Sequence, residues 1–205
     1  MQTIAQRVDL IRELLPSVSS IAELCCGDCE AQARTYAAEL SLSRYRGLDL
    51  SPAVVERNLE RGIDCVQGDA LAATVLRQFL DYDLVFFGPP LSTDCDGHRL
   101  HAYANVSPSF EDFTTLFLGT LGYRGALVCI CPKATTMGDV RSLYAHVKRH
   151  RPDVNLRLVH HSHSTITGAG ESTERRLKYV ELWFGSQLPD LWEARSSIRS
   201  SHDVG

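Results

Sequence analysis

Carboxylates and one glycine stand in this chain directly after short apolar runs. Gly27 follows the run Ile21–Cys26, Asp49 lies near the end of YRGLDL, and Asp69 lies in the tetrapeptide QGDA. A glycine lets the backbone approach a ligand closely, and a carboxylate accepts hydrogen bonds from hydroxyl or amino groups. Together these residues could bind a nucleoside, with one carboxylate on the ribose hydroxyls and the other on the adenine edge.

The glycines are too few for a ligand that carries phosphates. A dinucleotide site uses the pattern G-x-G-x-x-G, and only Gly27 is present here. The phosphate loop that ends in Gly-Lys-Ser/Thr is also absent from the sequence. NAD, FAD and nucleotide hydrolysis are therefore poor fits, whereas an adenosine without phosphates needs only what is present.

The elements that must position these residues follow from the hydrophobic pattern. A leading helix should end at Pro16, and five strand–helix units should follow. The predicted strands are 21–26, 45–50, 64–66, 83–87 and 126–131, and the predicted helices are 29–40, 52–61 with Ser51 as a hydroxyl N-cap, 74–80, 110–121 and 138–150. Two last apolar runs, 156–160 and 179–184, predict an antiparallel hairpin joined by a polar loop over 162–177.

This order indicates an α/β fold. We expect a doubly wound, mostly parallel seven-stranded sheet with helices on both faces and the hairpin at one edge. A chain of 205 residues with 44% hydrophobic content predicts one domain: a leading helix (1–18), a core (19–185) and a polar tail (186–205). In such sheets the ligand lies at the carboxyl ends of the strands, beside the first strand.

Charge and cysteine content limit the partners. Residues 1–100 carry 9 Lys/Arg against 15 Asp/Glu, and residues 101–205 carry 12 against 10, so an anionic partner should meet the second half. The seven cysteines are odd in number and suit small buried hydrophobes in a reducing compartment better than a disulfide framework. The charged, amphipathic first residues do not resemble a signal peptide or membrane span, so we expect a cytoplasmic protein with no membrane partner.

Four motifs resemble those of the class I S-adenosylmethionine-dependent methyltransferases. AELCCGDC is similar to the glycine motif of that family, GLDLS to its ribose motif, QGDA to its adenine motif and DLVFFGPP to the end of its fourth strand. The resemblance covers about residues 19–185, in the order of the family. It implies a Rossmann-like fold and S-adenosylmethionine as the cofactor.

The resemblance also implies roles for single residues. Glu23 would lie near the methionine amino group, Cys25 and Gly27 under the cofactor, Asp49 on the ribose hydroxyls, and Asp69 with Ala70 at the adenine. Glycines are usual in the family where Cys25 and Cys29 stand here. We expect the small Cys25 side chain to fit and that of Cys29 to narrow the loop.

The turn Gly88-Pro89-Pro90 is the candidate for catalysis. Amino-methylating members of the family carry Asp, Asn or Ser before Pro-Pro, and its side chain and nearby backbone carbonyls accept the amine hydrogens. An aromatic residue after Pro-Pro usually serves as a platform. Here Gly88 and Leu91 replace these two residues, so the carbonyls of Gly88 and Pro89 would have to serve as acceptors. The alternative is that Pro-Pro is only a stiff exit from the strand.

The polar stretch 91–109 has no clear period and should lie beside this turn. Tyr103 could stack on a base, Arg99 could contact a phosphate or carboxylate, and an Asp or His could take a proton. The candidate substrate residues are Asp94, Asp96, His98, Arg99 and Tyr103, with His101 beside them. A solvated surface loop is the alternative.

Two further groups of side chains have weaker interpretations. His160, His161 and His163 lack a cysteine pair at zinc-site spacing, so no metal is expected. The basic residues could follow a phosphate backbone or form a solvated helix face; they are Arg141, Lys148, Arg149, His150, Arg151, Arg175, Arg176 and Lys178.

Three functions stay open on this basis. The first is methyl transfer to an amino group on RNA or DNA, with a duplex target flipped out of the stack. The second is methyl transfer to a small molecule or protein by the same fold. The third is a cofactor-binding, catalytically weak subunit that supports another protein. Specificity would come from the 91–109 loop, the hairpin or a partner, which could be a protein or a second copy of the chain.

Overall fold

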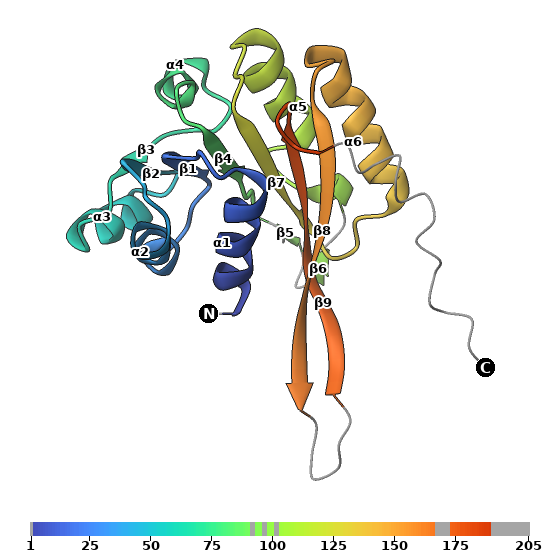
Figure 1. Cartoon of the computed structure of the whole chain (residues 1–205), viewed down its shortest axis with the longest axis horizontal. Helices are drawn as coiled ribbons and strands as arrows, with labels where there is room; N and C mark the ends of the chain where they lie inside the picture. Colours follow the sequence, from blue (N-terminus) through green and yellow to red (C-terminus); the bar gives the residue numbers. More distant parts are fainter. Residues whose placement is uncertain (1, 91–92, 96–97, 101–102, 167–172, 190–205) are drawn as a thin grey trace.

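A computed structural model describes residues 2–90, 93–95, 98–100, 103–166 and 173–189. Its main sheet has seven strands in the order β3-β2-β1-β4-β7-β9-β8 (Figure 1). The strands are β1 Ser20–Leu24, β2 Arg44–Asp49, β3 Cys65–Gln67, β4 Leu84–Phe87, β7 Ala126–Pro132, β8 Asn155–Ile166 and β9 Thr173–Gly185. Each overlaps a run that the hydrophobic pattern predicts as a strand.

Helices connect the strands as the pattern predicts. They are α1 Gln2–Leu14, α2 Glu30–Glu39, α3 Pro52–Glu60, α4 Ala73–Leu76, α5 Phe110–Thr114 and α6 Met137–His150, with the short turns η1 Arg77–Phe79 and η2 Tyr103–Asn105 and the π-helical segment η3 Thr115–Thr120. Within the residues described, no helix is both long enough and apolar enough to cross a bilayer.

The sheet is doubly wound. Strands β3, β2, β1, β4 and β7 are parallel neighbours, and β9 is antiparallel to both β7 and β8. The chain moves outward from β1 to β3 and then returns to place β4 on the other side of β1. The switch point therefore lies between β1 and β4, as expected for the ligand edge.

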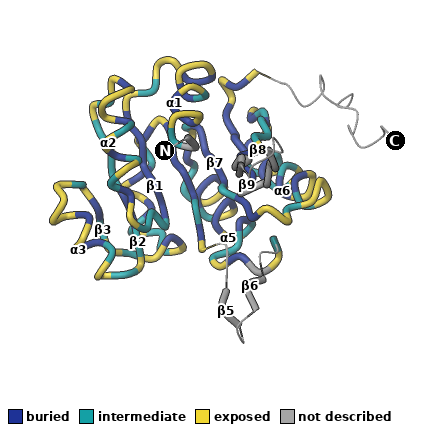
Figure 2. The backbone as a smooth tube through the Cα atoms, turned by 90° about the horizontal axis from the view of Figure 1, so that it is seen from below, coloured by how far each residue is buried: buried dark blue, intermediate teal, exposed yellow. Residues whose placement is uncertain are grey.

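Alternate side chains of the central strands pack on opposite faces of the sheet. On one face, Phe86 lies with residues of α1 and α2, and on the other Phe87 stacks on Phe113 of α5, with ring centroids 3.8 Å apart. Figure 2 shows the central strands β1 and β7 buried and the outer helix surfaces exposed. Helices on both faces, as predicted, leave only the ends of the strands for a ligand.

A buried ion pair fixes α1 to the sheet. Arg7 on α1 contacts Glu181 on β9, and both side chains are almost fully buried. The indole Nε1 of Trp183 donates to Glu181 Oε2 at 3.0 Å, and His161 Nε2 lies 2.9 Å from the same oxygen. These partners offset part of the cost of burying the charges.

The predicted polar loop at 162–177 is wrong. Strands β8 and β9 continue their antiparallel pairing to Ile166 and Thr173, past an irregularity between His161 and Ser162. We call residues 162–178 the arm. Strand β7 ends at Pro132, opposite Tyr179, so the arm extends past the carboxyl end of β7 (Figure 1). The sequence over 162–177 predicted a loop because it is mostly polar and lacks the apolar alternation of a half-buried strand.

Three other segments differ in detail from the predictions. Part of the 91–109 stretch forms a hairpin of β5 Thr93–Cys95 and β6 His98–Leu100, and η2 follows it. Ser51 stands at the N-cap of α3, but its side chain makes no capping hydrogen bond. The helix predicted over 110–121 changes to a π-helical path at Thr115, and periodicity alone does not distinguish the two helix types.

Candidate functional site

The turn after β1 has two residues in the left-handed backbone region. Cys25 has φ 58° and Gly27 has φ 57°. This conformation favours glycine. A cysteine at position 25 therefore strains the backbone of the turn, although its side chain was expected to be small enough for the site. The space where a Cβ of Gly27 would stand is open, with no atom within 4 Å in the described structure. The turn therefore leaves room for a ligand over Gly27.

Asp49 joins this turn to the end of β2. Its Oδ2 accepts a hydrogen bond from the backbone N–H of Gly27, and its Oδ1 accepts one from Ser51, both at 2.9 Å. A carboxylate has about four acceptor positions, so two remain available. Because Asp49 is only half-buried, these can accept from ligand hydroxyls.

Asp69 and Ala70 follow β3, beside Asp49. The backbone N–H of Gly68 donates to the carbonyl of Asp49 at 3.0 Å, which holds the ends of β2 and β3 together. Oδ1 of Asp69 accepts from the N–H of Leu71 at 2.8 Å, and the side chain is exposed. Ala70 is buried in the core. Asp69 can therefore offer an acceptor to a ligand, whereas Ala70 can contribute only its backbone.

Two exposed leucines at the carboxyl ends of the strands are candidate site residues that the sequence did not predict. Leu50 follows Asp49 and is 69% exposed, and Leu71 follows Ala70 and is 37% exposed. An apolar side chain left in water directly after a strand-end carboxylate suits the face of an aromatic ring. The signal was present in GLDLS, where the second leucine falls beyond the strand.

Glu23 lies beneath the turn and is buried. Its Oε1 has no hydrogen-bond partner of normal geometry among the residues described, although the hydroxyls of Tyr36 and Tyr45 lie nearby. Burial raises the pKa of Glu23, and the positive charge of Arg7 opposes this shift. An unpartnered acceptor at this place is consistent with a cationic ligand group above the turn.

Cys29 does not narrow the loop as expected. Its side chain is fully buried, beside the thiol of Cys26 and the hydroxyl of Tyr45. Cys29 is the N-cap residue of α2, with φ −102°, a value open to any residue. The backbone at position 29 therefore does not require a glycine.

The turn Gly88-Pro89-Pro90 lies at the switch point. The backbone N–H of Gly88 donates to the carbonyl of Leu24 at 3.0 Å, so this turn stands beside the one after β1. Pro89 is buried and Pro90 exposed. A Cβ at position 88 would lie 3.1 Å from Cδ1 of Ile130, so the missing acceptor side chain would have to displace that methyl group.

Only part of the predicted substrate loop can be placed. Asp94 on β5 stands opposite Arg99 on β6 in the backbone register, and His98 begins β6. The side chains of these three, and all of Asp96 and His101, lie outside the described residues. Tyr103 stacks on Phe110 with ring centroids 5.2 Å apart, and its hydroxyl donates to Glu111 at 2.9 Å. A base could therefore stack only on the other face of this ring.

Two members of the histidine and basic groups are buried rather than exposed. His161 is buried against Tyr179, with ring centroids 4.7 Å apart. Arg151 was expected on an exposed basic face, but it is buried and donates to the carbonyls of Tyr123 and Gly125. Among the described residues, no group of three or more His, Cys, Asp or Glu side chains is arranged to hold a metal ion.

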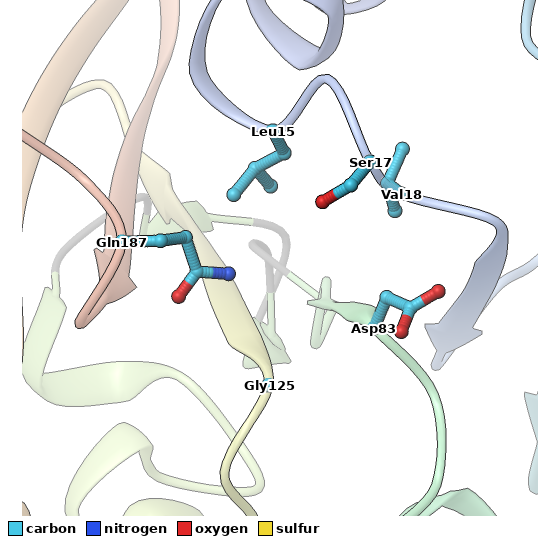
Figure 3. A pocket seen from close by; sticks show the side chains of 6 residues that line it. All are labelled: Leu15, Ser17, Val18, Asp83, Gly125 and Gln187. Atoms are coloured by element: carbon cyan, nitrogen blue, oxygen red, sulfur yellow. The ribbon is translucent and has the colours of Figure 1, made fainter.

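A small cavity of about 120 Å³ lies at the opposite ends of the strands from this site (Figure 3). Asp83 and Gly125 on its wall directly precede β4 and β7, so it is at the amino ends of the strands. Oδ2 of Asp83 already accepts from the backbone and hydroxyl groups of Ser19 and Ser20. This cavity is separate from the strand-end site.

Taken together, the strand-end residues fit an adenosine-containing cofactor with a cationic amino group. The turn at Gly27 is open, Asp49 and Asp69 have free acceptor positions, and Leu50 offers an apolar surface. Below the turn, Oε1 of Glu23 is an acceptor with no hydrogen-bond partner of normal geometry among the described residues. No residue at this edge offers the lysine or glycine pattern that phosphates require.

Comparison with known proteins gives likeness in structure alone. No family model matches the chain, and no curated protein matches it either.

Solved structures with the same architecture include several methyltransferases. The methyltransferase domain of bacterial Hen1 has a TM-score of 0.61 at 14% identity, over 90% of this chain and 97% of that one. Precorrin-6y C5,15-methyltransferase from Geobacter metallireducens has a TM-score of 0.56 at 15% identity, over 89% and 85%. A SAM-dependent methyltransferase from Archaeoglobus fulgidus has a TM-score of 0.53 at 11% identity, over 88% and 93%. The chain therefore has the Rossmann-like fold of the class I S-adenosylmethionine-dependent methyltransferases.

Proposed function

We propose that this protein is an S-adenosylmethionine-dependent methyltransferase whose acceptor is an amino group on RNA or DNA. The observation that carries the cofactor assignment is the hydrogen bond from Gly27 to Asp49, at 2.9 Å. It joins the open left-handed turn to a carboxylate with free acceptor positions, at the switch point of a methyltransferase fold. Asp69 and Leu50 extend the same surface.

Each residue of this surface has a distinct role in holding the cofactor. Asp49 accepts from the ribose hydroxyls, Asp69 accepts from the adenine amino group, and Leu50 covers one face of the ring. Glu23 attracts the amino group of the methionine part from below. S-adenosylmethionine, when bound, supplies a methyl group on a positively charged sulfur, which an amine can attack.

Positioning of the acceptor amine falls to the turn after β4. The carbonyls of Gly88 and Pro89 accept the amine hydrogens, which directs the lone pair of the nitrogen toward the methyl group. Pro89 and Pro90 hold these carbonyls in place because their φ angles are restricted. The backbone thus does what a side-chain acceptor does in proteins with Asp or Asn at this position.

The shape of the same edge favours a large acceptor. The arm projects past the carboxyl end of β7, and the hairpin β5–β6 follows the turn at Gly88. Both stand at the edge that holds the cofactor surface (Figure 1). A polynucleotide would contact these projections, whereas a small molecule would not need them.

One observation favours the alternative that the protein is a cofactor-binding but catalytically weak subunit. Residue 88 carries no side-chain acceptor, and a Cβ there would lie only 3.1 Å from Cδ1 of Ile130, so the chain is packed around a glycine at the position where amino-methylating proteins have their acceptor. If backbone carbonyls cannot replace that acceptor, binding would persist without transfer.

The cofactor assignment is tested by calorimetry with S-adenosylmethionine. Asp49→Ala should weaken binding about tenfold or more, because two hydrogen bonds to a charged group are lost. Asp64→Ala is the matched control, since Asp64 precedes β3 and pairs with half-buried Arg46. Equal affinity in the Asp49 variant and the unaltered protein, or no binding by the unaltered protein, would contradict the proposal.

The acceptor is tested by transfer of a labelled methyl group to total RNA, to DNA and to a metabolite and protein extract. Label on RNA or DNA in a methylamino base supports the leading proposal. Label only in the extract supports methyl transfer to a small molecule or protein. Cofactor binding without any labelled acceptor supports the catalytically weak subunit.

A further inference from the structure

The turn between β1 and α2, residues 25–29, is called the cofactor turn below. Three thiols meet at this turn, and we call them the thiol cluster: Cys26, Cys29 and Cys65. Cys26 and Cys29 belong to the sequence CGDC between β1 and α2, and Cys65 begins β3. The sulfur atoms of Cys26 and Cys65 are 3.8 Å apart. Cys26 is half-buried, whereas Cys29 and Cys65 are buried. All three are free thiols.

A glycine between the strands allows these sulfurs to meet. Gly47 on β2 pairs with Cys65 on β3. A Cβ at position 47 would lie 2.9 Å from the sulfur of Cys26 and 3.2 Å from that of Cys65. Any other residue would push the two sulfurs apart, so the contact depends on the missing side chain.

Asn58 of α3 supports the same pair. Its Nδ2 lies 3.8 Å from each of the two sulfurs and donates to the carbonyl of Gly27 at 2.9 Å. The side chain is fully buried, and its Oδ1 has no hydrogen-bond partner among the residues described. A buried amide with an unused acceptor, fixed between two thiols and the cofactor turn, is a costly arrangement to keep for packing alone.

The protonation of the pair is uneven. Hydrogen bonds from Cys26 and Asn58 lower the pKa of Cys65, whereas the pKa of Cys26 is raised because its proton is shared with the neighbouring sulfurs. Burial and the carboxylates of Asp49 and Asp69 raise the pKa of the adjacent Cys25 to about 12. The thiols with a lowered pKa, Cys65 and Cys29, therefore belong to the cluster, and Cys25 does not.

We propose that Cys26 and Cys65 form an oxidisable dithiol, which a hydroperoxide converts to a disulfide. The thiolate of Cys65 attacks one oxygen of the peroxide, the O–O bond breaks, and a sulfenic acid and hydroxide result. The hydroxide takes the proton of Cys26 and becomes water. The sulfur of Cys26 then attacks that of Cys65, the S–S bond forms, the S–O bond breaks, and hydroxide leaves and takes a proton from solvent. Two electrons pass from sulfur to peroxide.

The disulfide would change the cofactor turn. An S–S bond is about 2.05 Å long, so Cys26 must move toward β3 when it forms. Cys26 is bonded to Gly27, whose N–H donates to Asp49 and whose carbonyl accepts from Asn58. The oxidised protein should therefore bind S-adenosylmethionine at least tenfold more weakly. This consequence rests on the proposed function, whereas the disulfide itself does not.

Peptide mapping of the full chain tests the disulfide without any cofactor. The folded protein is treated with hydrogen peroxide, free thiols are alkylated, and the unreduced protein is digested with trypsin. A cross-link should join peptide 13–34, which holds Cys26, to peptide 62–77, which holds Cys65. Dithiothreitol should remove it, and the buried Cys129 and Cys131 should be recovered as alkylated thiols.

Variants identify the sulfurs and decide the outcome. Cys26→Ser and Cys65→Ser should each abolish the cross-link, while Cys25→Ser and Cys29→Ser, in the same peptide as Cys26, should keep it. Circular dichroism before oxidation shows whether each variant is folded. A bond between Cys26 and Cys29, or oxidation that stops at a sulfinic or sulfonic acid, would overturn the proposal.

Calorimetry on reduced and oxidised samples tests the effect on the cofactor. No binding by the reduced protein would refute the proposed function and leave the disulfide result standing. Binding by the reduced protein that is unchanged after cross-linking would refute the regulatory consequence alone. Weaker binding that dithiothreitol restores supports both.

Discussion

Burial of the Glu23 carboxylate is unfavourable for stability, and the same carboxylate is proposed to contact the cofactor. Its side chain is almost fully buried beneath the cofactor turn, and burial raises its pKa above the ordinary value of 4.5. Arg7 lies close enough to oppose the shift, but it already pairs with Glu181. An ionised Glu23 is therefore only partly compensated in the free protein, and a cationic ligand group would complete it.

Glu23→Gln should reveal this cost as a pH dependence. A carboxylate with a raised pKa contributes most stability below about pH 4.5 and loses that contribution as pH rises through the pKa of the folded state. The variant should therefore gain in free energy of unfolding relative to the unaltered protein between pH 4.5 and pH 8, measured by urea unfolding.

A second carboxylate supplies a control of opposite sign. Arg61 lowers the pKa of exposed Asp28, so the unaltered protein should lose stability relative to Asp28→Asn as pH falls toward the lowered pKa. If the difference in free energy of unfolding between Glu23→Gln and the unaltered protein does not change with pH, the pKa of Glu23 is the same in the folded and unfolded states, which would contradict the prediction.

At the scale of elements, the turn between β1 and α2 carries the strain of the site. The turn brings Gly27 to Asp49 by placing residue 25 in the left-handed region, where this chain has a cysteine. A side chain in that conformation costs about 1–2 kcal/mol. The packing of Cys25 against the core offsets part of this cost.

The strain predicts an inverted order of stability for two small substitutions. Cys25→Gly should be more stable than Cys25→Ala by about 1 kcal/mol, because only glycine adopts the left-handed conformation freely. At Cys129 in β7, which has an ordinary negative φ, alanine should be the more stable replacement. Thermal melts of the four variants measure both differences. If Cys25→Ala is more stable than Cys25→Gly, the turn is not strained at position 25.

At the scale of the whole molecule, charge and shape bear on the acceptor together. The second half of the chain holds 12 Lys/Arg against 10 Asp/Glu, and Arg141 and Arg149 on α6 are exposed. The arm, which contains Arg175, Arg176 and Lys178, extends from the same half past the edge of the sheet that carries the site. A polyanion would approach this half, while the acidic first half repels it.

A polynucleotide acceptor should make transfer sensitive to salt. With three phosphate contacts, affinity for single-stranded RNA should fall about tenfold or more between 50 and 200 mM salt, because bound counterions are released. Binding of S-adenosylmethionine, measured by calorimetry over the same range, serves as the control and should change little. An acceptor KM that does not respond to salt would contradict a polynucleotide and favour a small molecule.

The sequence by itself determined the alternation of strands and helices, and with it the edge at which Asp49, Asp69 and Gly88 lie. These follow from local patterns, since apolar periodicity and strand-end residues act over a few positions. It did not determine the arm, because polar ribbon and polar loop have the same composition. Nor did it show that Arg151 turns inward to the carbonyls of Tyr123 and Gly125.

Only the tertiary structure decided which distant groups touch. Cys26 and Cys65 are 39 residues apart, and their contact depends on the order of β1, β2 and β3, on the register that places Gly47 opposite Cys65, and on the space this glycine leaves. The left-handed backbone at Cys25 likewise belongs to a turn that the hydrogen bond between Gly27 and Asp49 ties to the end of β2. Local propensity sets where elements form, but packing of the whole sheet sets the contacts between them, and those contacts define the site.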